Sequence, residues 1–139
     1  MNIDDQIELY CEQGNDLFDE DDFKGAINIW QKAFDLLADP FDDWEHATWL
    51  KVSIGDSYYM LDEYETALDA MLDTLNYPEA IDNPFIHFRA GQCHYQLNDK
   101  ERSKNALLKA YMLAGKEIFE DHEEDGLFYY DFLKSEVAI

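Results

Sequence analysis

The chain has 139 residues, with 32 acidic side chains against 10 basic ones, and a formal net charge of −22 at pH 7. Its aromatic fraction of 15% is too high for a disordered acidic chain, so we expect one folded domain with a hydrophobic core. The charge disfavours nucleic-acid binding and favours a basic protein partner. The apolar runs are too short to span a membrane and the acidic N-terminus is unlike a signal peptide, which predicts a cytoplasmic protein that binds no membrane.

A pattern that begins at Gly14 recurs at Gly55 and Gly91, and it predicts three consecutive helical hairpins. Each of these glycines is followed by a small residue 12 positions later and by another 19 positions later. Small residues at this spacing allow the two helices of a hairpin to approach closely. The hairpins are expected at about residues 7–40, 48–81 and 84–119 of a single domain that covers residues 1–139.

A tight turn followed by a helix N-cap is predicted inside each hairpin. The turn dipeptides are Asp21-Asp22, Asp62-Glu63 and Asn98-Asp99. The third hairpin differs from the others because Lys100 replaces an aromatic residue and Ser103 replaces an alanine. We therefore expect the third hairpin to pack less tightly.

The apolar spacing of the third hairpin continues through Ile118 and Phe119, which predicts a long last helix that includes Gly115. The aromatic stretch after it, at about residues 123–136, is expected to form a capping helix. Such a helix would close the exposed hydrophobic end of the row. The total expected is about seven helices.

The first copy of the pattern, Gly14-Asn15-x-x-Phe18-x-x-x-Asp22-Phe23-x-x-Ala26-Ile27, resembles the tetratricopeptide repeat (TPR). The resemblance implies an all-α, right-handed superhelical solenoid of three TPR hairpins plus the capping helix. In TPR proteins the first helix of each hairpin lines a concave groove. The groove positions implied here to bind a partner are Asn15, Phe18, Trp49, Asp56, Tyr59, Phe85, Phe88, Gln92 and Tyr95.

TPR proteins that bind chaperones grip a C-terminal carboxylate with lysine and arginine side chains of this groove. Of such a clamp only Asn15 is present, and Cys11, Val52 and Phe88 stand where the cations would be. The resemblance therefore disfavours binding of an acidic chaperone tail. An aromatic groove flanked by acids instead suits an extended segment or a helix that carries basic residues.

The negative charge is concentrated near the N-terminus, because residues 1–46 carry 14 acidic and 2 basic side chains. We expect this end of the molecule to present an acidic surface to the basic partner. The candidate residues of this surface are Asp16, Asp19, Glu20, Asp42, Asp43 and Glu45.

No enzyme motif is found in the sequence, and we expect neither a cofactor nor a metal. The four histidines form no cluster at metal-ligand spacing, and Cys11 and Cys93 are interpreted as small buried hydrophobic residues. The stretch from Asp121 to Gly126 resembles the start of a calcium loop, but Phe132 stands where the bidentate glutamate is required. A catalytic function is therefore not expected.

The runs IDNPFIHFRAGQ (residues 81–92) and AYMLAG (residues 110–115) resemble a group of small bacterial three-repeat TPR proteins. Such proteins are often encoded beside Rhs-type polymorphic toxins, which implies an immunity protein that binds and neutralises a basic toxin C-terminal domain. The alternative is a TPR scaffold or chaperone-like adaptor that binds an extended peptide or helix. A third possibility is self-assembly through the C-terminal helix, although a monomer is expected.

Overall fold

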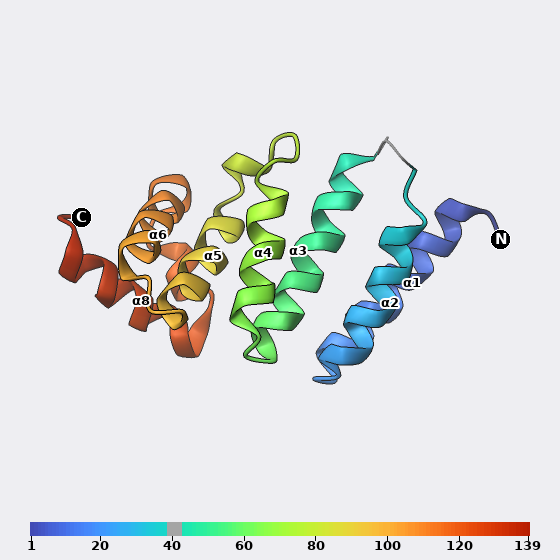
Figure 1. The fold of residues 1–139 in the computed structure, drawn as a ribbon, viewed down its shortest axis with the longest axis horizontal. Coiled ribbons are helices and arrows are strands. Elements are labelled where there is room, and N and C mark those ends of the chain that lie inside the picture. Colours follow the sequence, from blue (N-terminus) through green and yellow to red (C-terminus); the bar gives the residue numbers. More distant parts are fainter. Residues whose placement is uncertain (39–42) are drawn as a thin grey trace.

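The computed structural model describes residues 1–38 and 43–139 of the chain, and over these residues it consists of helices and the turns between them (Figure 1). Six helices pair into three hairpins, and two further helices follow. The hairpins are α1 (Ile3–Asp19) with α2 (Phe23–Asp35), α3 (Trp44–Met60) with α4 (Tyr64–Thr74), and α5 (Pro84–Gln96) with α6 (Lys100–Ala114). A 3₁₀ helix, η1 (Ala80–Asp82), precedes α5. The two helices after the hairpins are α7 (Glu117–Glu120) and α8 (Glu123–Glu136).

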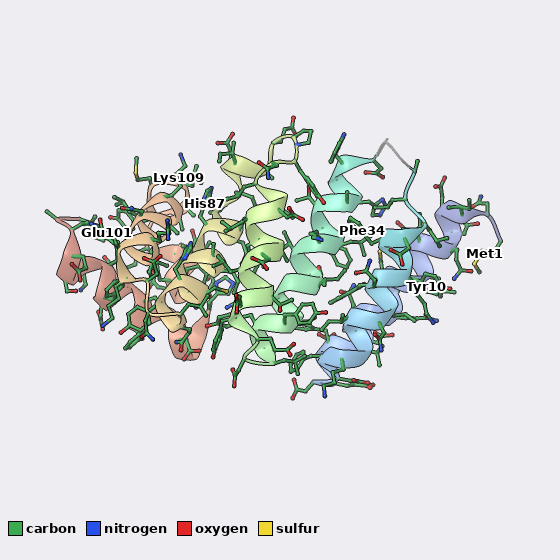
Figure 2. The ribbon with its side chains drawn as sticks, in the orientation of Figure 1. Met1, Tyr10, Phe34, His87, Glu101 and Lys109 are labelled. Atoms are coloured by element: carbon green, nitrogen blue, oxygen red, sulfur yellow. The ribbon has the colours of Figure 1, made fainter. Side chains whose placement is uncertain are left out.

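The hairpins stand side by side in one row, with the two termini at opposite ends (Figure 1). Each of the first six helices packs mainly against its neighbours along the chain, and the contacts of α2 with α3 and of α4 with α5 join successive hairpins. Side chains fill the spaces between the ribbons (Figure 2). This arrangement confirms the expected all-α solenoid with a C-terminal capping helix.

The three turns inside the hairpins share one backbone geometry. Asp21, Asp62 and Asn98 adopt positive φ values of 62°, 61° and 64°, which asparagine and aspartate tolerate better than most residues. The residue after each of them is the N-cap of the next helix. The side chains of Asp22 and Asp99 accept hydrogen bonds from backbone N–H groups three residues later, as expected for N-caps, whereas Glu63 makes no such bond.

The glycines of the pattern lie where the two helices of a hairpin touch. A Cβ atom at Gly14 would overlap the Trp30 indole of α2, and a Cβ at Gly91 would come within 2.7 Å of the Leu107 side chain of α6. The expectation of looser packing in the third hairpin is wrong. Ser103 is fully buried, and its hydroxyl donates a 2.7 Å hydrogen bond to the Gly91 carbonyl oxygen.

The long last helix that was expected is interrupted at Gly115. This residue has φ of 71° and ψ of −163°, a positive-φ conformation that favours glycine and ends α6 at Ala114. The chain then forms the short helix α7, so the described residues contain eight α-helices rather than about seven. Helix α8 packs against α6 and α7, and Gly126 permits its backbone to approach the carbonyl of Phe119.

Substituting Gly14→Ala tests the contact between α1 and α2. The added methyl group collides with the Trp30 ring, which is buried and has little room to move. We expect the free energy of unfolding in urea to fall by about 1–3 kcal/mol. The control Asp16→Ala, an exposed position on the same helix, should change it by less than about 0.5 kcal/mol. Equal stabilities of the two variants would contradict this close approach.

Candidate partner-binding groove

A hollow of about 470 Å³ lies between α1 and α3. It exists because α2, rather than α1, makes the main contact with α3, so that α1 and α3 stand apart. Of the predicted groove residues, Asn15 and Trp49 line it. The complete lining consists of Glu8, Cys11, Glu12, Asn15, Asp43, Glu45, His46 and Trp49.

A second hollow, of about 660 Å³, continues from the first along α3. The two hollows share Glu45 and Trp49, and the second ends at the segment from Pro78 to Asn83. We call the two hollows together the open groove. The second hollow adds Trp44, Thr48, Val52, Pro78, Glu79, Ala80 and Asn83 to the lining.

Trp49 lines both hollows of the open groove and has 39% of its surface accessible. Its ring packs edge-on against Trp30, at 5.6 Å between centroids. Trp30 is buried, and its indole N–H donates a 3.2 Å hydrogen bond to the Cys11 carbonyl oxygen. The half-buried Phe18, another predicted groove residue, packs against Trp30 at 6.0 Å. Trp49 is therefore held on a rigid aromatic base while its outer face stays available.

The walls of the open groove are acidic. Among its described lining residues, acids are present on both α1 and α3, and none is lysine or arginine. His46 lies between two of these carboxylates, with its Nδ1 2.7 Å from Asp43 and its Nε2 3.7 Å from Glu8. Hydrogen bonds from the His46 backbone N–H and ring lower the pKa of Asp43. Asp43 is therefore ionised at neutral pH, and the groove attracts cations.

The predicted acidic surface divides into two parts. Asp43 and Glu45 line the open groove, whereas the exposed Asp16, Asp19 and Glu20 lie at the end of α1 and in the turn after it, outside that lining. Asp42 lies outside the described residues.

The third hairpin does not offer the aromatic groove that was expected. Phe88 is fully buried, because the rings of Phe119 and His122 cover it at centroid distances of 5.3 and 4.8 Å. The half-buried Phe85 also packs against His122, and Tyr95 packs against three rings of α8. The segment that contains α7 and α8 thus closes the part of the concave face that α5 would line.

Two more predicted groove residues, Gln92 and Tyr59, lie outside the lining of the open groove. Gln92 has 1% of its surface exposed and Tyr59 has 8%, so both are buried. Both contact Arg89, a residue that sequence reasoning missed. The Arg89 guanidinium donates a 2.6 Å hydrogen bond to the Gln92 side-chain oxygen and lies 4.1 Å from the Tyr59 ring centroid.

Arg89 also contacts Asp56, another predicted groove residue. Its Nη2 lies 2.8 Å from Asp56 Oδ1, so this ion pair joins α5 to α3. Two predicted groove residues with polar side chains, Asp56 and Gln92, therefore belong to an internal network around Arg89. A cation inside an apolar helix was the available signal, since Arg89 and Lys51 are the two basic residues between positions 47 and 97.

The described residues include histidine, cysteine and many carboxylate side chains. No group of three His, Cys, Asp or Glu residues among them is placed to hold a metal ion, and none of their helices is long and apolar enough to cross a membrane. Burial, followed by the charges of Glu8 and Glu12, raises the pKa of the Cys11 thiol to about 11. Burial raises the pKa of the Cys93 thiol to about 12. Both thiols are protonated at neutral pH and are poor nucleophiles.

No protein-family model matches the chain, and no curated protein sequence matches it. Solved structures do match over nearly its full length. The Yersinia enterocolitica type III secretion chaperone SycD, in complex with a peptide of the translocator YopD, has a TM-score of 0.75 at 17% identity; the match covers 94% of this chain and 92% of SycD.

Two further structures share the fold. The first TPR domain of Spaghetti (RPAP3), bound to the HSP90 peptide SRMEEVD, has a TM-score of 0.71 at 15% identity, over 94% of this chain and 90% of that domain. PcrH, in complex with the chaperone-binding region of PopB, has a TM-score of 0.68 at 22% identity; the match covers 93% of this chain and 95% of PcrH. At these identities the similarity shows the fold alone, and that fold is the TPR solenoid.

The ion pair between Arg89 and Asp56 yields a stability prediction. Asp56→Asn leaves the buried guanidinium without its counter-charge, and the free energy of unfolding should fall by about 3 kcal/mol. Adding Arg89→Met to this variant should recover part of the loss, because the uncompensated charge is then removed.

The control for this pair is Asp73→Asn, which breaks the exposed 3.6 Å pair with Lys51 and should cost less than about 1 kcal/mol. Urea titrations of the four proteins measure these differences. An Asp56→Asn variant as stable as the wild type would show that the pair does not hold α3 against α5.

The Cys11 thiol yields a reactivity prediction. In a Cys93→Ala background at pH 8, Cys11 should react with iodoacetamide about two orders of magnitude more slowly than a free thiol, because its raised pKa leaves little thiolate. Glu8→Gln should accelerate the reaction modestly, since the carboxylate is a smaller cause of the shift than burial. Alkylation at the rate of a free thiol would contradict the environment described for Cys11.

Proposed function

We propose that the chain is a non-catalytic adaptor whose open groove binds an extended segment of a partner protein. The observation that carries this proposal is Trp49, an exposed ring that is fixed by the buried Trp30 and that stands where the two hollows meet. Rigid, partly exposed tryptophans are frequent energetic centres of protein interfaces. Solved structures of the same fold that hold a peptide or a binding region of another protein support this choice.

The segment that suits this groove is basic. The acids of its walls include Glu8, Glu12, Asp43 and Glu45. None of the described lining residues is lysine or arginine. A partner with lysine or arginine next to a large apolar residue would pair with the acids while the apolar residue covers Trp49. This preference is opposite to that suggested by the acidic peptide SRMEEVD bound to the RPAP3 domain.

A second candidate function is that of an acidic immunity-type protein that captures a basic toxin domain. The observation that favours it is the exposed acidic surface outside the groove, at Asp16, Asp19 and Glu20. A folded toxin domain would use this outer surface as well as the groove. The two functions therefore differ in whether binding depends mainly on Trp49 or mainly on the outer acids.

The test is selection of binders from a displayed library of random, extended dodecapeptides. We expect the selected peptides to be rich in lysine or arginine and in one large apolar residue. Trp49→Ala should weaken their binding by more than about tenfold, because it removes the central anchor. Isothermal titration with synthetic copies of the selected peptides measures the change.

The matched control is Leu72→Ala, which truncates an exposed apolar side chain on α4 that does not line the groove. It should leave the affinity unchanged. Enrichment of acidic peptides, or equal binding by the Trp49→Ala variant, would refute groove binding. A triple variant, Asp16→Asn with Asp19→Asn and Glu20→Gln, removes the outer acids. If this variant loses binding while Trp49→Ala keeps it, the immunity-type function is favoured instead.

A further inference from the structure

A separate pocket of about 390 Å³ lies where α8 folds back against the ends of α3 and α5. It shares no residue with the open groove. Four parts of the chain build it: the end of α3, the turn and first residue of α4, the end of α5, and α8. Its lining consists of Tyr59, Met60, Asp62, Tyr64, Tyr95, Gln96, Asp125, Phe128 and Tyr129, and we call it the aromatic pocket.

The walls of the aromatic pocket are made mainly of aromatic rings set at steep angles to one another. Tyr59 and Tyr64 meet at 5.5 Å between centroids, and Tyr95 meets Phe128 at 5.4 Å and Tyr129 at 5.5 Å. Tyr59 and Tyr129 are buried, whereas Phe128 is 51% exposed. The pocket therefore has a fixed aromatic interior and an accessible edge.

The polar groups of the aromatic pocket are oriented by the protein itself. The Tyr64 hydroxyl donates a 2.9 Å hydrogen bond to Asp62, and the Gln96 amide donates a 2.8 Å hydrogen bond to the Tyr129 hydroxyl. Burial and the neighbouring Asp62 raise the pKa of Tyr64 to about 12, so this phenol is neutral at pH 7. Asp62 and Asp125 provide the negative charge, and none of the lining residues is basic.

We propose that the aromatic pocket binds the cationic end of an arginine or lysine side chain of a partner protein. The faces of aromatic rings attract cations, and nearby carboxylates add to the attraction. Two rings of the pocket already contact cations of the chain itself: Arg89 lies 4.1 Å from the Tyr59 centroid and Lys100 lies 5.4 Å from the Tyr95 centroid. Neither Arg89 nor Lys100 lines the pocket, so these contacts leave its interior to an external cation.

The experiment uses the full chain labelled with ¹³C at its methionine methyl groups. Met60 lines the aromatic pocket and is 45% exposed, whereas Met112 is exposed on α6 outside it. N-acetyl-arginine amide and N-acetyl-lysine amide are titrated separately to millimolar concentrations. We expect at least one of them to shift the Met60 signal in a saturable way, with little effect on Met112.

Two neutral probes serve as controls, N-acetyl-citrulline amide and N-acetyl-leucine amide. Neither should shift the Met60 signal, because citrulline lacks the positive charge of arginine and leucine has no cationic group to pair with the carboxylates. An equal shift with either neutral probe would overturn the proposal. The absence of any Met60 shift with both cationic probes would also overturn it.

Because the chain carries a net charge of −22, cations accumulate at many places on its surface. Phe128→Ala distinguishes the pocket from this background, since it removes a wall without changing the charge. It should weaken the Met60 response about fivefold. Leu127 is the neighbouring residue, is 47% exposed and lies outside the pocket lining, so Leu127→Ala should leave the Met60 response unchanged.

A circular dichroism melt of each variant shows whether it is folded. Asp62→Asn provides a second folded variant that should also weaken the response, because it removes a carboxylate from an exposed turn. Unchanged binding by both Phe128→Ala and Asp62→Asn would refute the assignment. This outcome is independent of the open groove, whose variants do not touch the aromatic pocket.

Discussion

The packing of the C-terminal segment on α5 is the contact that decides what the rest of the molecule can do. A row of helical hairpins leaves an apolar face at each end, and here Phe119, Tyr129 and Leu133 bury such a face together with Phe88 of α5. Burial of one large apolar side chain contributes on the order of 2 kcal/mol, so this cluster is a substantial part of the stability. The same contact removes the third hairpin from the concave surface and confines the open groove to the first two.

Much of the fold could be predicted from the sequence because it depends on local spacing. A glycine and a small residue 12 positions apart identify each hairpin, and an aspartate or asparagine marks each turn. The exception is Gly115, which the apolar spacing predicts to lie inside a helix although glycine also favours the positive-φ conformation of a helix end. Its backbone angle depends on where α7 and α8 pack, and that information is not local.

The candidate site was harder to predict for the same reason. The resemblance to TPR proteins implies that Phe88, Gln92 and Tyr59 face the groove, but it does not say that a later segment will cover α5. Arg89 was missed because a single cation in a helix has no periodic signature. Its ion pair with Asp56 makes a predicted binding position an internal contact. Of the nine predicted groove residues, Asn15 and Trp49 line the open groove, and Asp43 and Glu45 of the predicted acidic surface line it as well.

The way in which the hairpins contact one another has a consequence for cooperativity. In a one-dimensional row, each unit is stabilised only by its nearest neighbours, and local unfolding begins at the end with the fewest contacts. Among the described residues, α1 and α2 meet the rest of the fold chiefly through α3, while the opposite end is held by α7 and α8. Resistance to hydrogen exchange should therefore decrease from α5 towards α1. A ligand held between α1 and α3 would add a second connection between the first two hairpins, beside the contact of α2 with α3, and would oppose separate unfolding of the first hairpin.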